Sequence, residues 1–213
     1  MVAERLDTGF MPADVVLQGR LVRLEPLSLD HVQALVTAAS EQRSSYGYTT
    51  VPADADAMAD YVRVALADRE TGRALPFATV EHDRVVGSTR FLDLDYWEPD
   101  AGGAGAASIP SVVEIGSTWL AASAQRSGVN TEAKLLMLAH AFDTWRVHRV
   151  TFKTDARNER SRRAIERIGA TFEGVRRAHV VATDGTIRDS AYYSIIASEW
   201  PAVKARLYAL APR

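Results

Sequence analysis

The seven residues from Gln125 to Thr131 combine features that suit the binding of an anion. A strand-like run ends just before them and a strongly patterned helix follows. The first backbone N–H groups of that helix have no internal partner and lie at the positive end of its dipole. Gly128 lets the loop curl so that several of these groups point at one anion, and Arg126 and the Ser127 hydroxyl could act as further donors. The arrangement suits a pyrophosphate.

The same loop fits other phosphate-binding motifs poorly. It lacks the Gly-Lys-Ser/Thr ending found in nucleotide hydrolases, which argues against hydrolysis of ATP or GTP. It holds a single glycine, so it is also a poor match to the three-glycine fingerprint of dinucleotide-binding folds. Taken alone, the segment could equally be a plain connection from a strand to a helix, capped by Asn130.

The bulk composition indicates one ordinary globular domain. The 213 residues are 47% hydrophobic and 24% charged, with a net charge of -2. The chain can therefore bury a core, and it lacks the overall positive charge that non-specific nucleic-acid or anionic-membrane binding requires. The absence of cysteine excludes disulfides, thiolate nucleophiles and cysteine metal sites. Without a signal-peptide pattern or a run of membrane-spanning length, we expect a cytoplasmic protein.

The period of the apolar residues switches repeatedly between values typical of strands and of helices. The predicted order is β-α-α-β-β-β-α-β-α-β-β-α, which indicates a single α/β domain with a mixed central sheet flanked by helices. The predicted segments are a strand over 20–27, a helix capped by Ser28, a helix opened by the acidic run 54–60, two strands within 74–96, a strand over 111–120, a helix containing Leu135 and Phe142, a strand over 148–155, a helix over 158–169, a hairpin over 171–197 and an amphipathic tail.

These elements divide the chain into three parts. We expect an N-terminal extension over 1–19, the α/β domain over 20–198, and a C-terminal amphipathic helix over 199–213 packed on that domain. The stretch "WEPDAGGAGAASIP" (97–110) has the composition of a mobile loop rather than a domain linker, because a strand follows it directly.

Several segments in this order resemble the GCN5-related N-acetyltransferase (GNAT) superfamily, and within it the branch that acetylates the N-termini of ribosomal proteins. The resemblance runs from about Arg20 to Ala197 and is strongest from Val113 onward. The segments that carry it are "EIGSTWL" (114–120), "AQRSGVNTEAK" (124–134), "DARNERSRRAIERIGATFEGVRR" (155–177) and "RDSAYYSII" (188–196). The resemblance implies a GNAT-like fold, acetyl-CoA as co-substrate and an amine as acceptor.

The resemblance also implies where coenzyme A would bind. The loop would hold its pyrophosphate through backbone N–H groups. The strand ending at Leu120 would separate from the 148–155 strand, which frees backbone groups for the pantetheine arm and for the thioester carbonyl. Asn158 would bind pantetheine or fix the next helix, and Arg163 would face the 3′-phosphate, whereas Arg160 and Arg167 are interpreted as helix surface charge. The implied coenzyme-binding residues are Thr118, Trp119, Leu120, Gln125, Arg126, Ser127, Gly128, Val129, Asn130, Thr131, Asn158, Ser161 and Arg163.

Amide formation requires a neutral amine, so some residue must accept a proton directly or through water. Glu114 is one candidate, because a carboxylate that alternates with Gly116 and Thr118 on a central strand is seldom there for packing alone; the alternative is a structural salt bridge. His179 lies near the position where this branch of the family carries its base, and the alternative is a histidine that only satisfies a hydrogen bond. By resemblance, the Ser161 hydroxyl could protonate the leaving thiolate, or it could bond the local backbone.

Two positions depart from the family pattern. Asn130 replaces a second glycine or alanine in the loop, and asparagine is a strong cap that tolerates left-handed geometry, so we expect the site to survive. Ile165 stands where many relatives carry a tyrosine, which excludes a tyrosine general acid there and leaves Ser161 or a water. No spacing of His, Asp and Glu suggests a metal site.

Together, these features predict an N-acetyltransferase that moves the acetyl group of acetyl-CoA to a primary amine by direct attack. The acceptor would be a protein N-terminus or a small molecule such as an amino sugar, an amino acid or an antibiotic. An α-amino group asks less of the base than lysine, because its pKa is lower. The acidic run at Asp54, Asp56 and Asp60 would suit a cationic acceptor or would stabilise a helix start. Another acyl-CoA, a non-catalytic acyl-CoA-binding regulator and a homodimer remain open alternatives.

Overall fold

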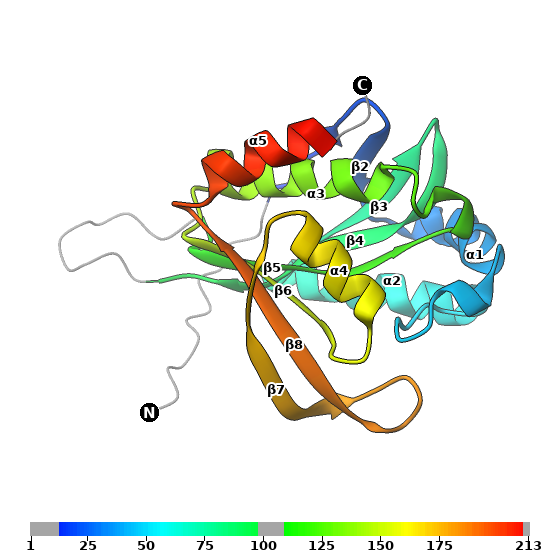
Figure 1. Cartoon of the computed structure of the whole chain (residues 1–213). Helices are drawn as coiled ribbons and strands as arrows, with labels where there is room; N and C mark the ends of the chain where they lie inside the picture. The colour runs from blue at the N-terminus through cyan, green and yellow to red at the C-terminus, as the bar shows by residue number, and fades with distance from the viewer. Residues whose placement is uncertain (1–12, 98–108, 211–213) are drawn as a thin grey trace.

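Helices cover both faces of one mixed eight-stranded sheet, whose strands run in the order β1-β2-β3-β4-β5-β6-β8-β7 (Figure 1). The computed structural model describes residues 13–97 and 109–210 of the chain. The strands are β1 Leu17–Gln18, β2 Val22–Pro26, β3 Leu75–Glu81, β4 Arg84–Asp95, β5 Val112–Leu120, β6 Arg149–Asp155, β7 Thr171–Val181 and β8 Ile187–Ile196. The helices are α1 Val32–Ser40, α2 Ala55–Glu70, α3 Val129–Ala139, α4 Glu159–Arg167 and α5 Trp200–Leu210. Apart from the two-residue β1, this is the predicted order, and the predicted fold class is confirmed.

The core lies where the central strands are enclosed by helices. Helices α1 and α2 pack against β4 and β3, while α3 lies against the other face with α5 beside it (Figure 1). All of β3 except Glu81 is buried, and Phe77 and Phe91 meet edge to face at its centre. A strand covered on both faces reads as a nearly continuous apolar run, which explains why its sequence shows little alternation.

The one parallel pair among the described strands, β5 with β6, stops soon after it begins. Residues Val112 to Glu114 pair with β6, and beyond Glu114 no pairing continues. Strand β5 stays bonded to β4 along its other edge, with an irregularity at Ser117, whose φ is +47°. The predicted separation of these two strands is therefore confirmed.

The irregularity at Ser117 changes which face later residues occupy. Gly116 pairs with Arg90, but Trp119 pairs with Ser88, so β5 carries one extra residue in this interval. Thr118 consequently faces α3 and bonds the Thr89 hydroxyl, at 2.7 Å between the oxygens. The prediction that Glu114, Gly116 and Thr118 share a face is wrong for Thr118, because a strand with a bulge loses its period of two.

Of the predicted helix caps, Asn158 is confirmed, whereas Ser28 caps a 3-10 turn over Leu29–His31 that leads into α1. Asp54 caps α2 by accepting a bond from the Ala57 N–H, and Asn158 caps α4 as predicted. Helix α3 begins at Val129 with Gly128 as its cap residue, at a φ of +97°. The interpretation of Asn130 as the cap is therefore wrong, because Asn130 is already the second residue of the helix.

A buried carboxylate fixes α3 to the start of the sheet. Glu132 accepts three backbone N–H bonds, from Arg20, Leu21 and Val22, at 2.7 to 3.0 Å. Gly19 passes so close that an added Cβ would lie 2.6 Å from this carboxylate. Helix α3 is thereby held in register with β2, which sets the position of the loop that precedes it.

The outer parts of the chain are a long hairpin and the tail helix. Strands β7 and β8 form one edge of the sheet, where β8 pairs with β6, and α5 packs beside α3 with Trp200, Val203 and Leu207 buried (Figure 1). Most of the Gly-rich stretch 97–110, and residues 1–12 of the N-terminal extension, lie outside the described residues. None of the helices within 13–97 and 109–210 has the length and apolar character needed to cross a membrane.

Candidate active site

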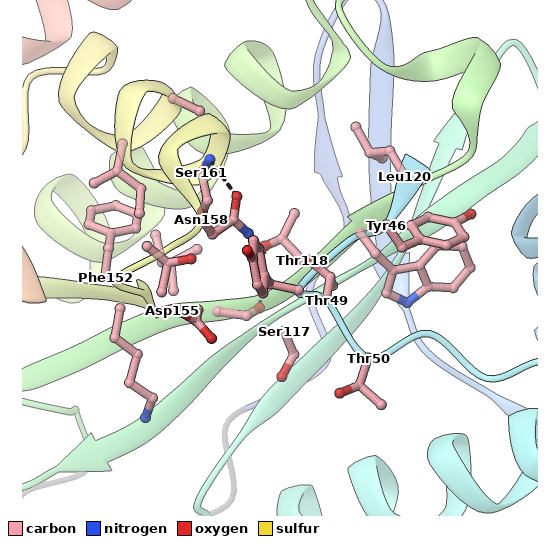
Figure 2. Close-up of a pocket in the computed structure, with 18 of the residues that line it drawn as sticks. Tyr46, Thr49, Thr50, Ser117, Thr118, Leu120, Phe152, Asp155, Asn158 and Ser161 are labelled. Carbon is pink, nitrogen blue, oxygen red and sulfur yellow. Dashed lines mark hydrogen bonds between the residues drawn. The ribbon is translucent and has the colours of Figure 1, made fainter. Parts of the chain in front are cut away.

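A cavity of about 1130 Å³ opens where β5 and β6 separate. This volume exceeds the range of about 300–1,000 Å³ typical of small-molecule sites, so it can hold a long ligand together with a second, smaller one. Figure 2 shows its two sides, with Asn158 and Ser161 of α4 facing Ser117 and Thr118 of β5. Tyr46, Thr49 and Thr50, from the segment between α1 and α2, line it further along (Figure 2).

The loop before α3 lies at one end of this cavity and presents unpaired donors. Arg126 and Gly128 both have left-handed backbone angles, with φ of +62° and +97°, and this curls the chain. The N–H groups of residues 126–128, 130 and 131 bond no described group of the protein. A curled backbone whose N–H groups converge at a helix start is a binding site for anions. Gln125, Arg126 and Asn130 of this loop line the cavity, and the pyrophosphate loop stays a prediction.

Side chains of the loop mostly hold the loop itself. The Ser127 hydroxyl donates to the Ala124 carbonyl at 2.7 Å, and because a hydroxyl has one proton, the prediction of Ser127 as a further anion donor is wrong. The Gln125 amide donates to the Leu120 carbonyl and to the Ser45 hydroxyl. The side chain of Val129 is buried in the core. The loop would therefore bind through its backbone and through Arg126.

Helix α4 brings Asn158 and Ser161 to the cavity. The Asn158 side-chain oxygen accepts the Ser161 N–H at 3.0 Å, the bond drawn in Figure 2. Of the two roles expected for Asn158, fixing the helix is thus observed, and its side-chain NH₂ bonds no other described group. The Ser161 hydroxyl likewise makes no hydrogen bond to the described protein. It is free to act on a ligand.

Three basic residues of α4 lie beside the cavity. Arg160 donates to the Gln125 side chain and to the Ser45 carbonyl, and Arg167 donates to the Thr131 hydroxyl at 3.2 Å. Both side chains are exposed, as their interpretation as helix surface charge predicts, and both also line the cavity near the loop. Arg163 also lines the cavity, but its guanidinium pairs with Glu159 one turn earlier.

Glu114 lies in the cavity and pairs with a lysine. Its side chain is 5% exposed, and its carboxylate lies 2.9 Å from the Lys153 ammonium of β6. Burial raises the pKa of Glu114, and the ammonium opposes this shift only in part. Gly116 makes room for the carboxylate, since a Cβ there would lie 2.7 Å from its oxygen. A carboxyl group with a raised pKa facing a cavity is suited to accepting a proton.

His179 lies on the β7–β8 hairpin, outside the residues that line the cavity. Its Nδ1 lies 2.9 Å from the Ser190 hydroxyl and its Nε2 lies 3.4 Å from the Tyr192 hydroxyl. Burial, helped by the neighbouring cations, lowers the pKa of His179. The structure therefore brings Glu114 and Ser161 together around the cavity and leaves His179 beside it.

Sequence reasoning missed two buried cations in the cavity wall. Lys134 of α3 donates to the hydroxyls of Thr118 at 2.7 Å and Thr89 at 3.3 Å, and burial lowers its pKa to about 7. Arg90 of β4 is 5% exposed and faces α2. The available signal was a charged residue inside an otherwise apolar run, "AKLLMLA" and "TRFLDL" respectively. Within the described parts of the chain, no group of His, Asp and Glu side chains could hold a metal ion.

The chain matches a known protein family and a curated relative. The family model described as "Acetyltransferase (GNAT) domain" matches residues 21–171. A curated relative, the putative ribosomal N-acetyltransferase YdaF of Bacillus subtilis strain 168, is 34% identical over 91 residues. These cover 43% of this chain and 49% of the relative, so the match spans only about half of that protein's length.

Solved structures match over most of the chain. A GCN5-related N-acetyltransferase from Brucella melitensis superposes with a TM-score of 0.79 at 33% identity, covering 95% of this chain and 88% of that one. A putative acetyltransferase from T. thermophilus gives 0.75 at 34% identity, covering 93% and 97%. Mycobacterium smegmatis RimJ in complex with CoA-disulfide gives 0.72 over 93% of each chain, and at 22% identity it supports the fold alone.

Proposed function

Because the chain belongs to the family of acetyltransferase (GNAT) domains, we propose that it transfers the acetyl group of acetyl-CoA to a primary amine, either a protein N-terminus or the amine of a small molecule. Family membership makes it an N-acetyltransferase. The observation that supports the coenzyme assignment is the cavity between β5 and β6, which is lined by Gln125, Arg126 and Asn130 of a loop whose N–H groups at 126–128, 130 and 131 are unbonded.

The residues at this end of the cavity fit coenzyme A. The unpaired N–H groups would hold its pyrophosphate, and the guanidiniums of Arg126, Arg160 and Arg167 add positive charge where its phosphates would lie. Beyond Glu114, the edge of β5 that faces β6 has no strand partner and would bond the amides of the pantetheine arm. RimJ of M. smegmatis and the microcin C7 acetyltransferase MccE, which share this fold, were solved with CoA-disulfide and with acetyl-CoA and AMP respectively.

Acetyl-CoA supplies the acetyl group as a thioester, and residues of this chain would manage the charges and the protons. A backbone N–H near the Ser117 bulge would polarise the thioester carbonyl. Glu114 would take the proton from the amine directly or through a water, in preference to His179, which lies outside the cavity lining. The unbonded Ser161 hydroxyl would protonate the departing thiolate and regain its proton from water. A tyrosine cannot take this role here, because Ile165 stands at its position.

Two measurements test this proposal. Calorimetric titration with acetyl-CoA should give saturable binding, and release of the free thiol should follow when a panel of amines and peptides is added. Absence of acetyl-CoA binding would refute the coenzyme site, and binding without thiol release to any amine would favour a regulator that has lost turnover.

The loop can be tested with a matched pair of variants. Gly128→Ala places a Cβ where the pyrophosphate would approach, and we expect acetyl-CoA to bind at least about 10-fold more weakly, the loss of one charge-assisted bond. Gly185→Ala carries a similar left-handed strain, at a φ of +77°, in the β7–β8 turn, where a Cβ meets nothing within 4 Å. It should bind acetyl-CoA normally. Equal binding by both variants would contradict the placement of the pyrophosphate.

A further inference from the structure

Arg90 is a buried cation that lacks an acidic partner. It lies on β4 with a side chain only 5% exposed. No hydrogen bond or ion pair joins its guanidinium to another described residue, and its Nε is fully buried without a partner. A guanidinium is a permanent cation with five N–H donors, and its burial is costly unless these donors are bonded. Because Arg90 lines the cavity, the missing partner can come from a ligand.

The residues around Arg90 compensate the charge of its guanidinium only in part. The Tyr61 ring of α2 lies 4.7 Å from the guanidinium carbon, a cation–π contact. That contact covers one face of the planar group, and its in-plane N–H groups bond no described residue. Two parallel in-plane donors match the two oxygens of a carboxylate.

The acids of the cavity are already paired within the protein. The Asp60 carboxylate lies 2.6 Å from the Arg63 guanidinium. The Glu114 carboxylate lies 2.9 Å from the Lys153 ammonium, and the Asp155 carboxylate lies 2.8 Å from the Arg157 guanidinium. No other acidic side chain of the described residues lines the cavity. The charge of Arg90 is therefore left for a bound molecule to balance.

The position of Arg90 separates it from the proposed coenzyme site. Arg90 faces α2, whereas the preceding residue, Thr89, faces Lys134 of α3 on the opposite side of the sheet. Arg90 also pairs across the strands with Gly116, which directly precedes the Ser117 bulge. A group bound by Arg90 thus lies on the face away from the α3 loop, yet one strand from the backbone proposed to hold the thioester carbonyl.

We propose that Arg90 binds a carboxylate of the acetyl acceptor, so that the acceptor is a primary amine with a carboxylate a few bonds from the reacting nitrogen. This inference rests on the proposed N-acetyltransferase function and specifies its substrate. The carboxylate could be the α-carboxylate of an amino acid or the acidic first side chain of a polypeptide. The acidic run of α2 does not favour a cationic acceptor instead, because Asp54 caps the helix and Asp60 is paired with Arg63.

Paired acceptors that differ only in charge test this assignment. For the unchanged protein and for Arg90→Gln, kcat/KM would be measured with phenylalanine against phenylalaninamide, and with a Glu-initiated peptide against its Gln-initiated equivalent. Taking the ratio within each pair and comparing it between proteins cancels the intrinsic reactivity of each amine. In the acceptor pair whose acidic member the unchanged protein prefers, we expect the ratio of kcat/KM for the acidic to the neutral acceptor to fall about 10- to 100-fold in Arg90→Gln. This fall corresponds to the loss of a charged hydrogen-bonded pair. Whichever pair responds identifies the source of the carboxylate.

Arg90→Lys should keep part of the preference, because it retains the charge without the planar fork. Unchanged ratios in both acceptor pairs would overturn the inference. So would a loss of acetyl-CoA affinity in Arg90→Gln, since it would assign Arg90 to the coenzyme. Calorimetry of acetyl-CoA binding on the same samples reports both affinity and correct folding.

A binding measurement separates this inference from the proposed function. N-acetylphenylalanine and its amide, as product analogues, would be titrated into the protein saturated with coenzyme A, which requires no turnover. Binding of the acid that Arg90→Gln weakens about 10-fold or more, with no such effect on the amide, supports the inference even if no amine is acetylated. Thiol release with amines, combined with equal binding of acid and amide in this pair and equal binding of the N-acetylated Glu- and Gln-initiated peptides, would refute the inference and leave the N-acetyltransferase function intact.

Discussion

Replacing the buried Lys134 by methionine should change how the stability of the fold depends on pH. The Lys134 ammonium bonds only the hydroxyls of Thr118 and Thr89, and no carboxylate of the described residues pairs with it. Burial lowers its pKa from 10.5 to about 7. Methionine has a similar volume and no charge, and the two threonine hydroxyls remain bonded to each other without the lysine.

The direction in which stability changes with pH follows from the number of protons that the folded and unfolded chains bind. Between about pH 7 and pH 10.5 the unfolded chain keeps the proton on Lys134 and the folded chain does not, so the stability of the unchanged protein rises with pH. Each pKa unit is worth about 1.36 kcal/mol, and the full cost of charging the folded protein below pH 6 is about 5 kcal/mol. Over the accessible window from about pH 6 to about pH 9.5, the change is about 2 to 4 kcal/mol.

Urea unfolding followed by tryptophan fluorescence would measure this change at several values of pH. We expect Lys134→Met to exceed the unchanged protein in free energy of unfolding by about 2 to 4 kcal/mol more at pH 6 than at pH 9.5. The matched control is Lys204→Met. Lys204 is partly exposed and paired with Asp143, which helps raise its pKa, so its removal should give a nearly constant difference over the same window. Parallel stability profiles for Lys134→Met and the unchanged protein would refute the depressed pKa and the reasoning that burial dominates at this site.

Substitutions at four further residues test the buried carboxylate of α3, the cap of α4 and the choice of the general base. Glu132→Ala should lower the free energy of unfolding by about 2 to 4 kcal/mol by thermal or urea melting, because three buried N–H groups lose their acceptor, and Glu132→Gln should lose less. Asn158→Ala should cost about 1 kcal/mol as a lost helix cap, whereas Asn158→Asp should restore that stability. Glu114→Gln should lower kcat about 10²- to 10⁴-fold and remove the fall of kcat/KM as the pH drops through the raised pKa of this carboxyl. His179→Gln should change kcat less than about 3-fold, and a larger loss than that of Glu114→Gln would reverse the assignment of the base.

The order of elements could be predicted from the sequence because local signals agree with tertiary ones. Asn158 is a strong cap with the expected bond, the acidic run begins with the cap of α2, and the Asp-Gly turn at 184–185 joins the two predicted strands of the hairpin. The sequence predicts the wrong cap for α3, because glycine has no side chain that could indicate a cap. The nearby Asn130 is a residue type that is common at caps, but here it does not cap the helix. Strand β5 was misread beyond Gly116, since a bulge depends on the register with β4 and leaves no mark in the periodicity.

The charged residues show why the site was only half predictable. The prediction of surface charge for Arg160 and Arg167 agrees with their exposure, but it misses their contacts with the loop, because the direction of a long side chain depends on what the fold brings near it. Arg163, predicted to face the 3′-phosphate, lies exposed in an ion pair with Glu159.

What distinguishes the buried charges of this protein is where their partners lie. Glu132 is satisfied entirely by backbone N–H groups, and Glu114 by a lysine on the neighbouring strand, so both carboxylates are compensated within the fold. Lys134 is left with hydroxyls and Arg90 with an aromatic ring, so neither cation is compensated by a described acid. The Lys134 ammonium and the Arg90 guanidinium respond differently to burial without an acid, because an ammonium can lose its proton whereas a guanidinium cannot. Lys134 can therefore be accommodated by deprotonation, while Arg90 requires an anion, and on the face of the sheet that meets α2 that anion would be supplied by the acetyl acceptor.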